Sequence, residues 1–271
     1  MTERDDRTRL RSTFDAAAGR YDRIRPGYLP DVFDDIERLG GLGPGSRVLE
    51  IGCGTGQATV DLAMRGYAVV AVEIGSELAA IASRYLAGFE TTDVIVADFE
   101  RWELPSEPFD AVVSATAFHW IDPEMRFVKA ADALMPGGVL AIVDTEHVAG
   151  GTEQFFAEVQ DCYERWDPKT EPDLRLSAAA DIEANVDEVA RSGRFGPVSV
   201  RRYEWDQAYS TSDYLDLLLT YSGHLALEPH ARACLLDCIG SLIDDAYGGS
   251  ITKRYLTTLR LARRLDGPGS V

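Results

Sequence analysis

A glycine-rich segment between an apolar run and a helical pattern is the first part of the sequence suited to holding a ligand. The apolar run Val48–Ile51 is followed by Gly52, Gly54 and Gly56, and a helical pattern begins at Gln57. A strand, a glycine turn and a helix bring backbone N–H groups to the positive end of the helix dipole, where a ligand can approach the main chain closely. The segment therefore predicts a cofactor-binding loop.

Acidic residues at three predicted strand ends indicate which kind of ligand the loop receives. Glu50 precedes the glycines, Glu73 ends the second strand, and Asp98 ends the third and is followed by Phe99. Glu73 can accept hydrogen bonds from both hydroxyls of a ribose, and Asp98 can accept from the amine of adenine while Phe99 packs on the purine. Glu50 would repel a pyrophosphate and suits an ammonium group. Dinucleotide sites use G-x-G-x-x-G/A, a register that puts Gln57 at the third small position. We therefore expect a phosphate-free, cationic nucleoside.

The elements that position these residues alternate between short apolar runs and longer helical patterns. Such alternation is typical of an α/β fold with a doubly wound, mostly parallel sheet. Buried parallel strands are predicted at Val48–Ile51, Ala68–Val72, Val94–Ala97, Ala111–Ser114 and Val139–Val143, and helices at Gln57–Arg65, Ser76–Leu86 and Pro123–Leu134.

The sequence resembles the class I S-adenosylmethionine (SAM)-dependent methyltransferases. Leu49–Gly56 is similar to their first motif, Val70–Glu73 to their ribose-binding strand, Ala97–Phe99 to their adenine-contacting motif, and Leu134–Leu140 to the turn into their fifth strand. Arg25-Pro26-x-Tyr28 and Ala117–Trp120 are more weakly similar to small-molecule methyltransferases that include the trans-aconitate methyltransferase group.

This resemblance implies a Rossmann-like seven-stranded sheet with an antiparallel last strand, SAM as cofactor and S-adenosylhomocysteine as product. The cofactor-binding residues expected from the loop, the acidic positions and the resemblance are Tyr21, Arg25, Glu50, Gly52, Cys53, Gly54, Gly56, Glu73, Ile74, Asp98, Phe99 and Ser114.

The domain organisation expected on this basis is a core with two additions. Residues 1–40 are predicted to form a helical lid, 41–148 the SAM-binding core, and 149–195 with 207–248 a helical substrate cap. The final strands of the sheet are expected at 196–206 and 249–264. The spacing within Ile251–Arg264 fits a helix as well as a strand, and the resemblance favours the strand.

The segment after the fourth predicted strand, Ser114–Trp120, is expected to face the methyl group. It contains no Asn/Asp-Pro-Pro-aromatic element, no clustered Asp or Asn for a magnesium ion and no Pro-Cys pair. These features predict metal-free, in-line transfer to a small molecule, at oxygen first and at sulfur or nitrogen next. His119 is the candidate general base, and its alternative role is packing beside Trp120. A NAD-linked oxidoreductase and a non-catalytic SAM-binding module are the competing hypotheses.

Composition limits the partners and the compartment. The net charge of −18 disfavours nucleic acid as a partner, because such binding requires clustered Lys and Arg. No apolar run approaches the roughly 20 residues of a membrane span, and residues 1–7 lack the apolar core of a signal peptide, so we expect a cytoplasmic monomer or homodimer. No disulfide framework is expected, and Cys234 and Cys238, one helical turn apart, are predicted to be buried free thiols.

Overall fold

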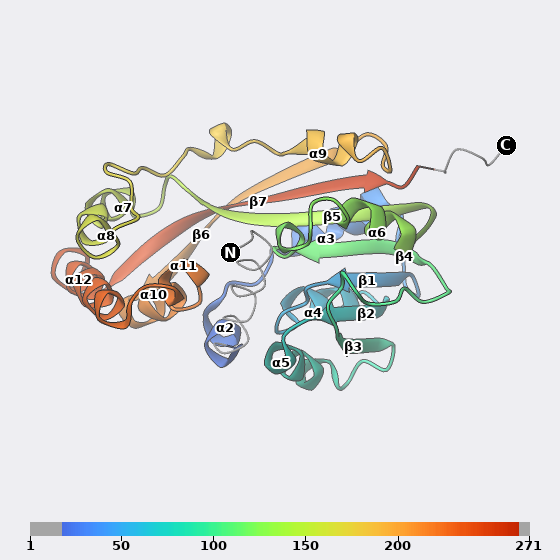
Figure 1. Ribbon diagram of the computed structural model, residues 1–271, viewed down its shortest axis with the longest axis horizontal. Helices are drawn as coiled ribbons and strands as arrows, with labels where there is room; N and C mark the ends of the chain where they lie inside the picture. Colours follow the sequence, from blue (N-terminus) through green and yellow to red (C-terminus); the bar gives the residue numbers. More distant parts are fainter. Residues whose placement is uncertain (1–17, 266–271) are drawn as a thin grey trace.

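A single seven-stranded sheet forms the centre of the computed structural model, which describes residues 18–265. The first 17 residues of the predicted lid therefore lie outside the described residues. The strand order is β3-β2-β1-β4-β5-β7-β6, with β7 antiparallel to both of its neighbours (Figure 1). The bounds are β1 Arg47–Ile51, β2 Ala68–Glu73, β3 Thr92–Val96, β4 Phe109–Ala115, β5 Leu134–Val148, β6 Ser199–Ser210 and β7 Ser250–Arg263. The doubly wound fold with an antiparallel last strand is confirmed.

Helices cover both faces of the sheet, because the side chains of each central strand alternate between two apolar clusters. In β1, Val48 belongs to the cluster that includes residues of α3 and α4, whereas Leu49 and Ile51 belong to the cluster that includes residues of α6. The bounds of these helices are α3 Pro30–Gly40, α4 Gln57–Met64, α5 Ser76–Leu86 and α6 Arg126–Ala133. A proline at the start of α3 and the left-handed Gly41 after it, at φ 70°, set its two ends.

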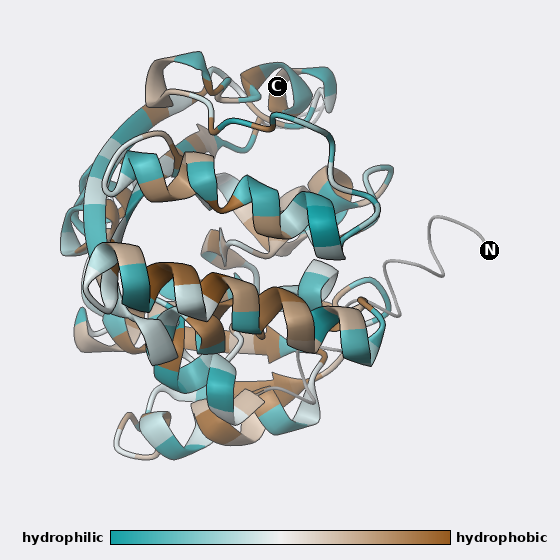
Figure 2. Cartoon of the chain, turned by 90° about the vertical axis from the view of Figure 1, so that its left-hand side faces the viewer, coloured by the Kyte–Doolittle hydropathy of each residue, from teal (hydrophilic) through white to brown (hydrophobic). Residues whose placement is uncertain are grey.

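Three long strands carry the chain away from this core to a second group of helices (Figure 1). We call this group the cap helices: α7 Glu153–Glu158, α8 Gln160–Trp166, α10 Thr211–Leu218, α11 Ser222–Leu225 and α12 Pro229–Tyr247. They pack around their own apolar cluster, which includes Phe155, Leu217 and Ile239. Figure 2 looks onto this side and shows polar and apolar turns mixed along the helices, as expected where one helix face is buried.

The segment between residues 166 and 199 leaves the cap helices and returns along the sheet (Figure 1). Helix α9, Val186–Arg191, brings Val189 into the same apolar cluster as Phe127 of α6, and Phe195 joins them. The C-terminal part of the stretch 149–195 thus covers the sheet. Strand β6 also continues to Ser210, beyond the predicted end at 206, because it pairs with β7 along its whole length.

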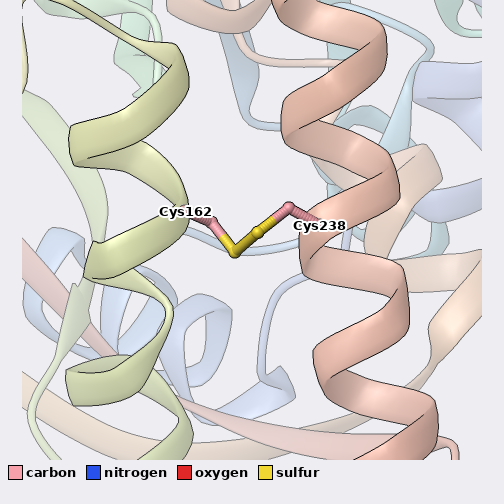
Figure 3. Close-up of a disulfide and its surroundings, with 2 residues drawn as sticks. All are labelled: Cys162 and Cys238. Carbon is pink, nitrogen blue, oxygen red and sulfur yellow. A yellow bond between two sulfur atoms is a disulfide. The ribbon is translucent and has the colours of Figure 1, made fainter.

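A disulfide between Cys162 of α8 and Cys238 of α12 joins two cap helices (Figure 3). The Cα atoms lie 5.9 Å apart, within the usual range for a disulfide. The sequence prediction of a free thiol at Cys238 is therefore wrong: 76 positions separate the partners, and spacing alone gives no sign that these helices pack together. Cys53 and Cys234 are free.

In the described part of the chain, no helix combines the length and the apolar character that crossing a bilayer requires.

Candidate active site

A cavity of about 300 Å³ opens at the carboxyl ends of the parallel strands, where α/β folds bind their ligands. Nine of the predicted site residues line it: Tyr21, Arg25, Gly52, Gly54, Glu73, Ile74, Asp98, Phe99 and His119. Because they come from α2 and from the segments that follow β1, β2, β3 and β4, only the folded chain brings them together.

The glycine turn after β1 packs directly against the segment that follows β4. Gly52 has φ 73°, and a Cβ atom added to it would lie 2.5 Å from the Cβ of Ala117. Its N–H donates to the carbonyl of Val72 at 2.8 Å, which fixes the turn to β2. Only glycine satisfies both the backbone angle and the close approach at this position.

Glu73 also makes hydrogen bonds to the backbone of the glycine turn, which the sequence did not indicate. Its Oε2 accepts a hydrogen bond from the Gly54 N–H at 2.9 Å, and its Oε1 accepts from the Gly75 N–H at 2.8 Å. The side chain is 6% exposed at the cavity wall. It therefore shapes the glycine turn from the end of the neighbouring strand.

Asp98 and Phe99 form the wall beyond β3. Asp98 Oδ1 accepts from the N–H of Glu100 at 3.0 Å, so this carboxylate also holds its own turn. Lys129 donates to the carbonyl of Trp102 at 2.6 Å, and its Nζ lies 5.2 Å from the centroid of the Phe99 ring. These contacts fix an aromatic face beside a carboxylate, an arrangement that suits a purine with an exocyclic amine.

Four predicted cofactor residues are not among those that line the cavity. Glu50 and Ile51 lie on opposite faces of the sheet. Glu50 is 1% exposed and lies among the residues under α4. Cys53 packs in the apolar cluster on that same face. Gly56 begins α4 at φ 90°, where a Cβ would lie 3.2 Å from Ala82. Ser114 is fully buried and donates to the carbonyl of Ile51 at 3.0 Å.

His119 lies on the short 3₁₀ helix Phe118–Trp120 and lines the cavity together with Trp120. His119 is partly accessible to solvent, and desolvation of its ring by the cavity wall lowers its pKa; Asp144 opposes this effect and the charge of Arg126 adds to it. The imidazole is therefore neutral at physiological pH and able to accept a proton. Its ring centroid lies 5.0 Å from that of Trp120, so the position suits both the catalytic and the packing hypothesis.

Helix α2, Ala18–Ile24, closes the cavity and is attached on two sides. Tyr85 of α5 donates to Asp22 at 2.8 Å. On the other side, Asp216 of α10 accepts hydrogen bonds from Arg20 at 2.9 Å and Arg23 at 2.7 Å. The helix that carries Tyr21 thus bridges the core and the cap helices.

Comparison with known proteins agrees with this geometry. A family model described as a methyltransferase domain matches residues 48–138. An uncharacterised methyltransferase of Mycobacterium tuberculosis is 35% identical over 131 residues, which cover 48% of this chain and 51% of the relative. Another, from Geobacillus kaustophilus, is 32% identical over 141 residues, covering 49% and 65%. The chain thus spans about half to two thirds of the length of these relatives.

Two solved structures share the fold at low sequence identity. A protein of Anaeromyxobacter dehalogenans, provisionally described as a type II methyltransferase, has a TM-score of 0.62 and 23% identity, and the likeness covers 89% of this chain and 98% of that one. The Haemonchus contortus phosphoethanolamine N-methyltransferase 2, in complex with phosphomonomethylethanolamine and S-adenosylhomocysteine, has a TM-score of 0.54 and 19% identity, covering 93% and 58%.

Residues 48–138 thus match a methyltransferase domain, and the chain has the fold of class I SAM-dependent methyltransferases.

The cavity also contains residues beyond those named one by one from the sequence. Thr116, at φ 56°, and Ala117 come from the turn after β4, within the segment Ser114–Trp120 that was expected to face the methyl group. Tyr221 and Ser222 come from the start of α11, more than 100 positions further along the chain. Tyr221 falls within the predicted cap segment 207–248. Its place at the cavity depends on how α11 packs, which no local pattern indicates.

Proposed function

We propose that this chain is a SAM-dependent methyltransferase that transfers a methyl group to an oxygen atom of a small molecule. The observation that carries the proposal is a pair of adjoining cavities. The first, of about 300 Å³, contains the glycine turn and the strand-end carboxylates, and the second has about 310 Å³. They share a wall of Tyr21, Arg25, Thr116 and Tyr221, as required where one cavity holds the methyl donor and the other the acceptor.

The residues of the first cavity fit SAM. Gly52 and Gly54 line this cavity without side chains, so the backbone of the turn is open to the ligand, and Glu73 and Asp98 offer acceptors to hydroxyl and amine groups. Phe99 offers a ring face to the purine. When bound, SAM supplies an electrophilic methyl group on a positively charged sulfur. The chain orients the two reactants and excludes water, largely through α2 and Tyr221.

The oxygen acceptor is supported by the neutral imidazole of His119 at the cavity wall, which can take up the proton that a hydroxyl group loses. Nitrogen and sulfur remain alternatives, because a neutral amine needs no base for its attack. The acceptor named with the H. contortus structure is a small molecule, which supports this size of substrate.

Calorimetric titration with SAM, S-adenosylhomocysteine and NAD tests the cofactor. We expect SAM and S-adenosylhomocysteine to bind and NAD to give no binding signal. Glu73→Gln should weaken the binding of both sulfur ligands tenfold or more, because the turn loses a carboxylate. Binding of NAD without either sulfur ligand would overturn the proposal.

Release of S-adenosylhomocysteine with panels of hydroxy, carboxy, thiol and amino compounds tests the reaction. We expect turnover with an oxygen acceptor, and we expect His119→Ala to lower kcat at least tenfold while the Kd for SAM changes less than twofold. Unchanged turnover in His119→Ala would make His119 a packing residue. If no compound in the panel led to release of S-adenosylhomocysteine, that result would indicate a binding module.

A further inference from the structure

The second cavity contains a buried positive charge. Its wall includes Thr145 and His147 of β5, Lys253 and Tyr255 of β7, and Tyr221, which also lines the cofactor cavity. Lys253 is 3% exposed. Its Nζ donates to the Tyr221 hydroxyl at 3.1 Å and lies 4.9 Å from the centroid of the Tyr255 ring.

No carboxylate among residues 18–265 lies within ion-pairing distance of Lys253. The strand geometry explains why. Side chains alternate along β7, so Arg254 lies on the opposite face, where it pairs with Asp206 at 2.8 Å. On β5 the acidic Asp144 likewise faces away from the cavity and pairs with Arg260. The acids of the neighbouring strands thus neutralise other cations.

A second cation lies at the same wall. Arg25 donates to the Thr220 hydroxyl at 2.8 Å and to its carbonyl at 3.1 Å, and its guanidinium lies 4.4 Å from the centroid of the Tyr221 ring. Within residues 18–265 it too has no carboxylate partner. A buried charge without a counter-charge is costly, and a chain of net charge −18 has many acids available to avoid that cost.

Two neutral groups beside the cations complete the wall. Burial lowers the pKa of His147 to about 3, and the charge of Lys253 adds to this effect, so the imidazole is uncharged. Its Nε2 is buried and has no hydrogen-bond partner in the described part of the protein. Burial would raise the pKa of Tyr221, but the charges of Lys253 and Arg25 outweigh this and lower it. The wall therefore favours negative charge near Lys253.

We propose that the second cavity is the acceptor site and that it takes small molecules carrying an oxyanion, a carboxylate or a phosphate, held by Lys253 with Arg25 as a second cation. The role of this molecule as methyl acceptor rests on the proposed function. Binding of an oxyanion in this cavity does not depend on methyl transfer. The shared wall of Thr116 and Tyr221 places the far end of such a molecule next to the cofactor cavity.

The test uses benzoate, phenyl phosphate and the uncharged benzamide as probes, titrated into the full chain with and without saturating S-adenosylhomocysteine. We expect at least one oxyanion to bind tenfold or more tightly than benzamide. The tighter of the two identifies carboxylate or phosphate as the preferred group. Equal affinity for charged and uncharged probes, or no binding of either oxyanion, would overturn the proposal and leave Tyr221 as the counter-charge of Lys253.

Three variants complete the experiment. Lys253→Met should lower the affinity for the oxyanion at least tenfold without changing that for S-adenosylhomocysteine, and Lys253→Arg should retain the oxyanion, which guards against a folding defect. Lys169→Met, on an exposed turn, is the matched control and should bind as the wild type does. Unchanged oxyanion affinity in Lys253→Met would overturn the proposal. If the wild type did not bind S-adenosylhomocysteine, that result would instead count against the proposed function.

Discussion

Among the residues of the cofactor cavity, Gly52 has the least room for a side chain. Alanine there would suffer the strain of a positive φ, about 1–2 kcal/mol, and its Cβ would also meet the Cβ of Ala117 at 2.5 Å. We expect Gly52→Ala to weaken SAM binding at least tenfold, because the turn must move away from the β4 segment. Calorimetric titration measures this change.

Gly45→Ala separates the clash from the strain. Gly45 has φ 88°, but a Cβ there would meet nothing within 4 Å. This variant should lower the melting temperature and leave the affinity for SAM unchanged. If both variants weakened SAM binding equally, the contact with Ala117 would have no part in shaping the site.

Glu50 is the residue whose burial should be visible in the pH dependence of stability. Burial raises its pKa to about 7, and the charge of Glu73 adds to this effect. A folded pKa above the unfolded value of about 4.5 means that the stabilisation is complete below pH 4.5 and is lost as the pH rises through 7. At pH 8, Glu50→Gln should therefore be more stable than the wild type by up to about 3 kcal/mol. At pH 4.5 the difference should vanish.

Denaturant unfolding of the ligand-free protein from pH 4.5 to 8 measures this effect. Glu90→Gln, on an exposed turn, is the control and should follow the wild-type profile. A stability difference between Glu50→Gln and wild type that stays constant with pH would contradict the explanation.

At the level of the residue, the position of Glu50 is only partly predictable from the sequence. Glu73 and Asp98, which the sequence places at strand ends, line the cavity. The sequence does not indicate which face of its strand Glu50 occupies, because a fully buried parallel strand is apolar on both sides and nothing in it marks the side that faces a ligand.

At the level of elements, helix α2 depends on the cap helices for its position. Asp216 of α10 accepts from Arg20 and Arg23, and these partly exposed pairs are worth about 1 kcal/mol or less each. Asp216→Asn should loosen the helix that carries Tyr21 and Arg25, so we expect SAM affinity to fall roughly five- to tenfold. The loss should appear mainly as faster dissociation, measured by stopped-flow fluorescence.

Asp206→Asn is the matched control for this variant. Asp206 also accepts two hydrogen bonds from arginine, at 2.8 and 2.9 Å from Arg254, but it lies on β6 outside both cavities. The same SAM dissociation rate in both variants would show that the α2 contacts do not control the cofactor.

The sequence predicted elements best where their signal is local. Helix Ser76–Leu86 has the predicted bounds, because its apolar positions follow a clear helical period. The last strand, Ser250–Arg263, was ambiguous, because its almost continuous burial between β5 and β6 removes the alternation that marks a strand. The acceptor-side residues Tyr221 and Lys253 come from elements whose packing depends on contacts distant in the sequence, so no spacing could assign them.

At the level of the whole molecule, the core and the cap helices share three strands. β5, β6 and β7 run from the region under α9 to the helices that carry the Cys162–Cys238 disulfide (Figure 1). The cap helices therefore cannot unfold without disturbing the ends of strands that also belong to the core. We expect one cooperative unfolding transition in calorimetry.

The disulfide should raise the temperature of that single transition. It closes a loop over 76 positions, for which the chain-entropy model gives about 4 kcal/mol of stabilisation. Dithiothreitol should lower the melting temperature of the wild type and of Cys234→Ala, which removes a free thiol, but not that of the Cys162→Ala/Cys238→Ala double variant. SAM affinity should stay the same in all three, because no disulfide residue lines the cofactor cavity. A second transition that appears only after reduction would mean that the cap helices unfold as an independent unit, in spite of the shared strands.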